Sequence, residues 1–300
     1  MLVTRIVHIS DLHFGQPAGV QILQSVKDVI YEVQPDLVAV SGDLTQSCTS
    51  REFAEARKYL DDIASIAPCV VVPGNHDIRW LGAVIRNLGG AGLLQEKAHE
   101  FKYSRYKKHI STELSDAREI PDDPSRGPAL VVAGLNTSHG IIRGSLTTRL
   151  RDLGVVGHLT RADIELAREA FEGAPPGAAR VVMIHHNPLR GPVSGRHGLA
   201  HTEQALREFA ALGTELILCG HDHQDAVHTV ERIAPDMDAP SMVISTAGTV
   251  SNRVQPGRAS SFNLVEVSRS KLAITTYSYN TDGRFVPLKE ASFPRDSGSF

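Results

Sequence analysis

Short apolar runs alternate with stretches of helical periodicity over the first quarter of the chain. Residues 20–33 carry apolar side chains at the spacing of one helix face. A second helix is expected to begin at Thr49, whose hydroxyl can cap it while Glu52 forms the other half of a capping box. Strand, helix and strand in this order predict an α/β fold with a parallel sheet. The predicted strands are 4–10, 37–41 and 69–72.

The later part of the chain predicts fewer helices and more strands. From residue 226 onward only short strands are expected, and strands without intervening helices pair antiparallel. We found no linker, so one domain over residues 1–300 is expected, which includes the antiparallel strands of about 226–280 and ends in a loose tail at 288–300. The other predicted helices are 80–88, 98–110, 160–172 and 202–212; the other strands are 129–135, 180–184, 215–219, 226–231, 241–246, 262–267 and 272–279.

A polar side chain follows each of the first three predicted strands at equal intervals. Asp11 lies 32 residues before Asp43, and Asn75 lies 32 residues after it. Because a strand, a crossover helix and the next parallel strand take roughly 30 residues or more, these side chains should lie side by side at one edge of a sheet. Asp43 would be the middle one.

Five short motifs fall at predicted strand ends, and they carry the carboxylate and imidazole groups that divalent metals bind. Residues two apart in an extended segment point the same way, so each DxH or HxH pair presents two groups to one side. Any one of these motifs occurs by chance, but five in order after apolar strands indicate a metal site. The motifs are DLH at 11–13, GD at 42–43, GNHD at 74–77, HH at 185–186 and GHDH at 220–223.

Composition argues against several other classes of protein. The chain has 41% hydrophobic residues, and its 31 basic and 34 acidic residues are well mixed, so a nucleic acid polymer is not an expected partner. Three scattered cysteines fit a reducing compartment. Because no apolar run approaches the ~18 residues of a membrane span and the N-terminus does not read as a signal peptide, we expect a soluble, cytoplasmic protein without a membrane partner. A homo-oligomer remains open.

In this order, DLH, GD, GNHD, HH and GHDH resemble the calcineurin-like metallophosphoesterase superfamily, over residues 6 to about 223. The segments AGTVSNR and SSFNLVEV that follow are similar to the branch that includes class III cyclic nucleotide phosphodiesterases. The resemblance implies a four-layer α/β/β/α sandwich of two mixed sheets flanked by helices, with a dinuclear metal site at the strand ends. It implies that Asp11, His13, Asp43 and His223 hold one ion and that Asp43, Asn75, His185 and His221 hold the other.

The implied chemistry is attack of a metal-bridging hydroxide on a phosphate ester. His76 is expected to steady the phosphoryl charge or protonate the leaving oxygen, with Asp77 fixing its tautomer. Manganese, iron and zinc all suit these ligands. The expected substrate is a small phosphodiester, with a cyclic nucleotide as the leading candidate. Phosphomonoesters and glycerophosphodiesters stay open, as do a non-catalytic metal-binding regulatory module and a partner-dependent nuclease.

Other residues near the motifs have weaker functional interpretations. His186 either supports a metal ligand, faces the substrate or is a structural turn residue, and Asn187 after it departs from the HHPP often seen in this branch. Asn252 and Arg253 could reach the phosphate or base of a substrate. His8, inside the first strand, is expected in the core. Four residues in glycine-rich loops could form the rim of the pocket: His139, Arg143, His197 and His201.

Overall fold

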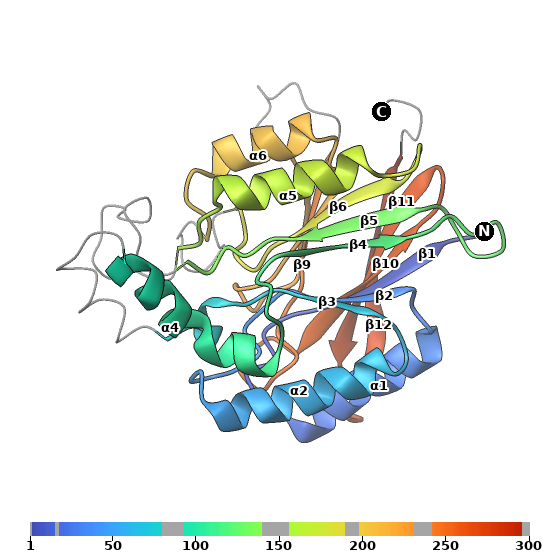
Figure 1. Ribbon diagram of the computed structural model, residues 1–300. Coiled ribbons are helices and arrows are strands. Elements are labelled where there is room, and N and C mark those ends of the chain that lie inside the picture. Colours follow the sequence, from blue (N-terminus) through green and yellow to red (C-terminus); the bar gives the residue numbers. More distant parts are fainter. Residues whose placement is uncertain are drawn as a thin grey trace.

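Two six-stranded mixed sheets face one another, and helices cover their outer faces (Figure 1). The structure is a computed structural model, and it describes residues 2–15, 18–79, 93–139, 156–189, 198–230 and 242–295. The arrangement is the four-layer sandwich that the family resemblance implied. The strand order is β12-β11-β10-β1-β2-β3 in the first sheet and β4-β5-β6-β7-β9-β8 in the second.

The first sheet joins the two ends of the chain. Strand β1 pairs in parallel with β2, which pairs in parallel with β3, while the other edge of β1 pairs antiparallel with β10. The strands that end just before Asp11 and Asp43 are therefore neighbours, as the equal spacing predicted. The strands are β1 Thr4–Ile9, β2 Leu37–Val40, β3 Cys69–Val71, β10 Ser261–Val267, β11 Lys271–Tyr279 and β12 Phe285–Pro294.

The second sheet has a parallel centre and antiparallel edges. Strands β5, β6, β7 and β9 run parallel, whereas β4 and β8 pair antiparallel with β5 and β9. Carboxyl ends of the parallel strands therefore meet at one edge of this sheet too. The strands are β4 Asp116–Ile120, β5 Leu130–Gly134, β6 Ala179–Met183, β7 Leu216–Cys219, β8 Ala226–Thr229 and β9 Val243–Thr246.

Capping boxes begin two of the outer helices. Thr49 Oγ1 accepts from the Glu52 backbone N–H at 3.2 Å, and Glu52 Oε2 accepts from the Thr49 N–H at 3.0 Å, which confirms the predicted box. Thr160 and Asp163 form a second box. The helices are α1 Val20–Val33, α2 Ser50–Ala64, α4 Leu93–His109, α5 Arg161–Glu172 and α6 Thr202–Ala211, with a short 3-10 turn, η1, at Asn75–Asp77.

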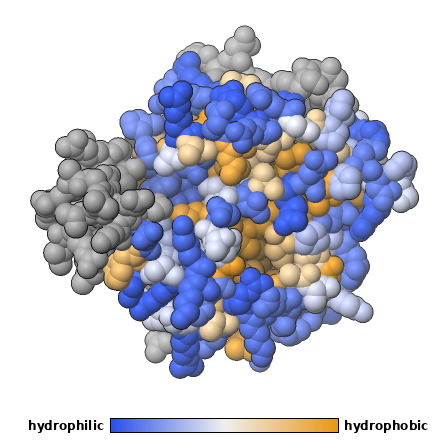
Figure 2. Space-filling model, viewed as in Figure 1, coloured by the Kyte–Doolittle hydropathy of each residue, from blue (hydrophilic) through white to orange (hydrophobic). Residues whose placement is uncertain are grey.

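Three apolar clusters hold the four layers together. One lies between α1, α2 and the first sheet, one between α5, α6 and the second sheet, and one between the two sheets. Figure 2 shows the face on which the layers are seen edge-on: hydrophilic residues cover the helical layers, and hydrophobic residues show between them. Burial of both faces of each sheet explains why the central strands read as continuous apolar runs.

Several sequence expectations need correction. The prediction of a loose tail at 288–300 was wrong for residues 288–294, because residues 285–294 form the edge strand β12. The prediction that all strands after 226 pair antiparallel was wrong for β9, which lies parallel to β7. Strand β4 was not predicted, and α4 begins at Leu93 rather than 98. The helix expected at 80–88 lies outside the described residues.

Helix α4 lies across the end of the molecule where the parallel strands finish (Figure 1). Tyr106 on α4 donates its hydroxyl to the Val71 carbonyl at 3.2 Å, and Arg105 donates to the Cys48 carbonyl at 2.6 Å. These bonds tie the helix to the loop that follows β2 and to the end of β3. No helix in the described part of the chain is long and apolar enough to cross a membrane.

We predict that His8 makes folding more sensitive to acid. His8 is fully buried, as expected, with Nε2 2.9 Å from Ser41 Oγ, and burial lowers its pKa from 6.5 to about 3. As the pH falls, His8 is therefore protonated at a higher pH in the unfolded chain than in the folded protein, and this favours unfolding. From about pH 7 to about pH 4.5, metal-free wild-type protein should lose about 2 kcal/mol more unfolding free energy than His8→Val, measured by urea denaturation. Equal losses would contradict the prediction.

Candidate metal centre

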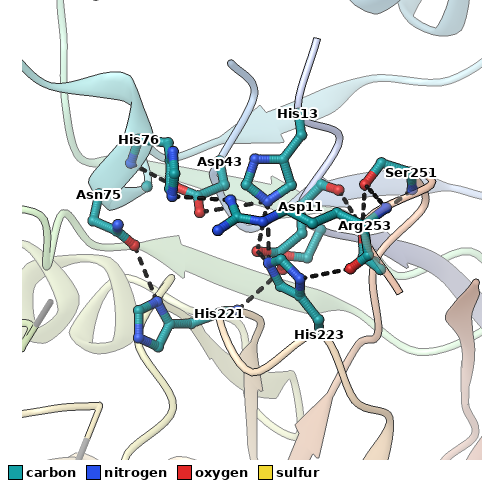
Figure 3. Close-up of polar contacts among 12 residues, drawn as sticks. Asp11, His13, Asp43, Asn75, His76, His221, His223, Ser251 and Arg253 are labelled. Carbon is teal, nitrogen blue, oxygen red and sulfur yellow. Dashed lines mark hydrogen bonds and ion pairs between the residues drawn. The ribbon is translucent and has the colours of Figure 1, made fainter. Parts of the chain in front are cut away.

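One group of possible ligands joins the loops after β1 and β2 to the loop after β7 (Figure 3). His223 Nε2 lies 3.1 Å from Asp11 Oδ1 and 3.1 Å from His13 Nε2. His13 Nε2 also lies 3.8 Å from Asp43 Oδ2. One ligand atom from each of these four residues lies within 4.8 Å of the others, so this group could hold a metal ion.

A second group lies beside the first and draws on both sheets. Asn75 Oδ1 lies 3.1 Å from His185 Nε2 and 3.0 Å from His221 Nδ1, and the two histidine nitrogens are 3.2 Å apart. His186 also has a ring nitrogen within 4.8 Å of ring nitrogens of His185 and His221. The family resemblance had grouped Asn75, His185 and His221, and the structure brings all three together.

The Asp43 carboxylate lies between the two groups. Its Oδ2 faces His13 Nε2 at 3.8 Å, whereas its Oδ1 faces His185 Nε2 at 3.5 Å. Oδ1 also accepts a hydrogen bond of 2.8 Å from the His76 backbone N–H, which fixes the plane of the carboxylate. Each oxygen is thus presented to a different set of possible ligands.

Backbone carbonyls set the orientation of two of the imidazole rings. His185 Nδ1 lies 2.7 Å from the Ser41 carbonyl oxygen, and His223 Nδ1 lies 2.9 Å from the Arg253 carbonyl oxygen. A carbonyl only accepts, so both Nδ1 atoms carry the proton and donate it. In the neutral rings, both Nε2 lone pairs therefore face the cluster, as metal ligands require.

The charges of the cluster also fit a cation site. Burial opposes ionisation of Asp11, but the charge of His223 and hydrogen bonds from His13 and His223 outweigh it and hold the pKa of Asp11 well below its usual range. Burial lowers the pKa of His221 to about 3, so this ring is neutral at physiological pH. Ionised carboxylates and neutral imidazoles are the forms that bind divalent metals.

Left-handed backbone conformations concentrate at these residues. Five of the eight non-glycine residues with positive φ among the described residues belong to the two groups, with φ from 47° to 74°. Such conformations cost about 1–3 kcal/mol each and persist where the surroundings enforce them. The extended conformation expected at the DxH and HxH pairs was therefore wrong, because all four of their ligand residues have positive φ. The five residues are Asp11, His13, Asp43, His221 and His223.

His76 and Asp77 do not interact as expected. His76 Nδ1 donates to the Gln46 carbonyl at 2.7 Å, and its Nε2 lies 3.0 Å from Arg253 Nη1. The prediction that Asp77 fixes the His76 tautomer was therefore wrong, because the backbone of Gln46 does so. The acceptor is the Gln46 backbone carbonyl, so no side-chain pattern in the sequence indicated this contact.

Asp77 instead ties the loops after β2 and β3 together. Its buried carboxylate accepts from the backbone N–H groups of Leu44, Thr45 and Gly74 at 3.0, 2.9 and 2.9 Å, and from the Thr45 hydroxyl at 2.9 Å. Burial raises the pKa of Asp77 to about 6, whereas the backbone donors favour its ionised form. Asp77 thus positions the backbone on both sides of Asp43.

The loop after β6 is shaped by two polar side chains. His186 is buried, with its Nδ1 2.8 Å from Thr137 Oγ1, and its ring lies 4.7 Å from that of His221. Asn187 Nδ2 donates to Asp222 Oδ2 at 2.7 Å and to Thr246 Oγ1 at 3.2 Å. The departure from HHPP therefore links this loop to the GHDH loop.

The remaining candidate residues have different surroundings. Arg253 reaches His76, whereas Asn252 is exposed, with its side-chain amide beside Gly19 at the start of α1. His139 Nε2 lies 2.9 Å from the Asn136 carbonyl, and His201 lines a cavity of about 590 Å³ between α5 and α6. Neither belongs to the two ligand groups. Arg143 and His197 lie outside the described residues.

The sequence profile of the family described as "Calcineurin-like phosphoesterase" matches residues 4–225. The chain therefore belongs to this family and is a metal-dependent phosphoesterase. The family uses a dinuclear metal site, for which the two groups supply candidate ligands.

Several known proteins resemble the chain at low identity. It is 25% identical over 242 residues to the 3',5'-cyclic adenosine monophosphate phosphodiesterase CpdA of Escherichia coli, covering 74% of this chain and 70% of CpdA. The structure of PhoD matches with a TM-score of 0.69 at 9% identity, covering 99% of this chain and 70% of PhoD. A purple acid phosphatase from yellow lupin (Lupinus luteus) matches with a TM-score of 0.62 at 13% identity; the match covers 98% of this chain but 54% of the phosphatase. The two structural matches show the shared fold.

We predict that Gly74→Ala displaces Asp43. A Cβ at Gly74 would fall 2.2 Å from both the backbone nitrogen and Oδ1 of Asp43. The variant should lose about 1–3 kcal/mol of unfolding free energy and bind divalent metal more weakly, measured by denaturation and titration calorimetry. Gly173→Ala is the matched control, since the nearest heavy atom to its Cβ would be the Glu169 carbonyl oxygen at 3.5 Å. Unchanged metal binding in Gly74→Ala would contradict the prediction.

Proposed function

We propose that this chain hydrolyses a small phosphodiester at a two-ion site, with a cyclic nucleotide as the leading substrate. The observation that carries the proposal is the position of Asp43, whose two oxygens face two separate ligand groups. A single carboxylate between two sets of imidazoles suits a pair of cations held close together.

The proposed ligands form two sets that share the Asp43 carboxylate. When bound, two such ions lower the pKa of water between them and polarise a phosphoryl group. The donor atoms available to them are carboxylate oxygens, an amide oxygen and ring nitrogens, which suit manganese, iron or zinc. One ion would be held by Asp11, His13, Asp43 and His223, and the other by Asp43, Asn75, His185 and His221.

His76 is the proposed residue for proton transfer or charge stabilisation at the leaving oxygen. The Gln46 carbonyl fixes its Nδ1–H, and the Asp43 carboxylate accepts from its backbone N–H, so the ring has a defined position beside the ligand groups. Its Nε2 is the atom that can hold or give a proton. Asp77 contributes by positioning the loops that carry Asp43 and His76.

The likeness to CpdA supports a cyclic nucleotide as substrate. The well-mixed charge of the chain also favours a small ester over a nucleic acid polymer. Both arguments concern the substrate rather than the reaction, so a substrate panel is the deciding experiment.

We expect metal-reconstituted protein to hydrolyse 3',5'-cyclic AMP and bis(p-nitrophenyl) phosphate in preference to p-nitrophenyl phosphate and glycerophosphodiesters. The measurement is kcat/KM for each ester with manganese, iron or zinc added to metal-free protein. A higher kcat/KM for the monoester or for a glycerophosphodiester would contradict the proposed substrate class. No turnover with any ester in protein shown to contain metal would favour a non-catalytic module.

We predict that Asp43→Ala weakens both metal sites, whereas His13→Ala chiefly weakens one. The reason is that Asp43 faces both ligand groups, and His13 Nε2 belongs to the first. Metal bound per chain, measured by elemental analysis at limiting metal, should fall toward zero in Asp43→Ala and toward one in His13→Ala. Circular dichroism of each metal-free variant checks that the fold is retained. The same metal content in Asp43→Ala and wild type would refute the shared role.

A further inference from the structure

The Arg253 side chain extends across the first ligand group to the opposite side of the site (Figure 3). Its Nη1 lies 3.0 Å from His76 Nε2 and 3.3 Å from Gln46 Oε1. Arg253 follows β9, whereas Gln46 and His76 follow β2 and β3. The guanidinium therefore connects loops that are far apart in the sequence.

The main chain of Arg253 is held in place independently of its side chain. Its carbonyl accepts from His223 Nδ1 at 2.9 Å, and its N–H donates to Ser251 Oγ at 3.2 Å. Ser251 in turn lies 2.7 Å from Thr249 Oγ1, which donates to the Asp11 carbonyl at 2.7 Å. The position of the loop therefore does not depend on where the guanidinium points.

The partners of the guanidinium are neutral. His76 carries its proton on Nδ1, because that atom faces the Gln46 carbonyl, so its Nε2 accepts from Arg253. Gln46 Oε1 is an amide oxygen. Among the described residues, no carboxylate forms an ion pair with Arg253, although its side chain is exposed at the mouth of a site for an anionic ester. An anionic phosphoryl oxygen attracts the guanidinium more strongly than a neutral acceptor does, because both partners then carry charge.

This contact also occupies the atom that catalysis needs. As long as Arg253 donates to His76 Nε2, that nitrogen cannot face a leaving oxygen. A substrate that attracts the guanidinium away would free His76 at the same moment. The switch needs only a rotation of the Arg253 side chain, since its main chain is fixed by other bonds.

We propose that Arg253 is a substrate-binding residue with two positions: it rests on Gln46 and His76, and it moves to a non-ester phosphoryl oxygen when a phosphate anion enters. This inference rests on the proposed function, because it names the group at that site that recognises the charge of the substrate. Gln46, which no sequence pattern singled out, provides the resting position. The ligand class is a phosphoryl anion, of which inorganic phosphate is the smallest.

The test compares three variants of metal-reconstituted protein: Arg253→Gln, Gln46→Ala and the control Arg258→Gln. Arg258 is an exposed arginine further along the same loop. Titration calorimetry with inorganic phosphate measures anion binding without requiring turnover, and elemental analysis measures metal content. Kinetics with bis(p-nitrophenyl) phosphate then separate KM from kcat.

Arg253→Gln should bind phosphate roughly 10- to 100-fold more weakly, as expected for loss of a charge-assisted hydrogen bond, and its KM should rise while its metal content stays the same. Arg258→Gln should match wild type. Gln46→Ala should bind phosphate as tightly as wild type or more tightly, because it removes a competing acceptor, and the Gln46 carbonyl still holds His76.

Two results would overturn the inference: wild-type phosphate affinity in Arg253→Gln, or weakening by Gln46→Ala as large as that by Arg253→Gln, which would make the contact a structural tether. Failure of the proposed function has a different signature. It would show as absence of ester hydrolysis in wild type, and the phosphate titrations would still test Arg253.

Discussion

The site depends first on the Asp77 carboxylate, which holds two strand-end loops in one arrangement. Three backbone N–H groups from two loops point at this buried carboxylate, and hydrogen bonds to charged groups are worth about 1.5–3 kcal/mol each. Leu44 and Gly74, which provide two of them, adjoin Asp43 and Asn75 in the chain. A residue that touches neither ligand group through its side chain thus determines where both groups can form.

The same loops show why strain and close packing occur together at this end of the molecule. Asp43 has a positive φ, and Gly74 approaches its backbone so closely that a side chain would not fit. Conformations of this kind are unfavourable in isolation and are maintained by the bonds around them. The apolar clusters between the layers fix the strands, and the polar bonds of Asp77 and Ser41 then fix the side chains at the strand ends.

Features with a strong periodic signal could be predicted from the sequence. The buried strands, the helices α1, α2, α5 and α6 and the capping box at Thr49 were correct, since burial on both faces leaves a continuous apolar run and burial on one face leaves a helical period. The adjacency of β1, β2 and β3 followed from the 32-residue interval between the polar residues at their ends. Convergence of the motifs followed from placing them at strand ends, whereas the grouping of Asp11, His13, Asp43 and His223 came from the family resemblance.

Features that depend on contacts between residues distant in the sequence could not be predicted from it. Strand β12 is an edge strand with mostly exposed residues, including Lys289 and Glu290, so it lacks the apolar alternation of a buried strand. The parallel pairing of β9 with β7 is set by the sheet and not by local pattern. Asp77 next to His76 suggested a contact between them, yet backbone donors from another loop occupy the carboxylate.

The pairing of β1 with β10 has a consequence for the order in which the molecule can assemble. Asp11, Asp43 and Asn75 emerge from the ribosome early, but the strand that borders β1 begins at Ser261. His185, His221 and His223 follow strands of the other sheet. A nascent chain therefore carries only the first of the proposed ligands for most of its synthesis, and the remaining ones are added with the strands of the second sheet. Under the proposed ligand assignment, the complete ligand set therefore forms only after the strands of both sheets have been made.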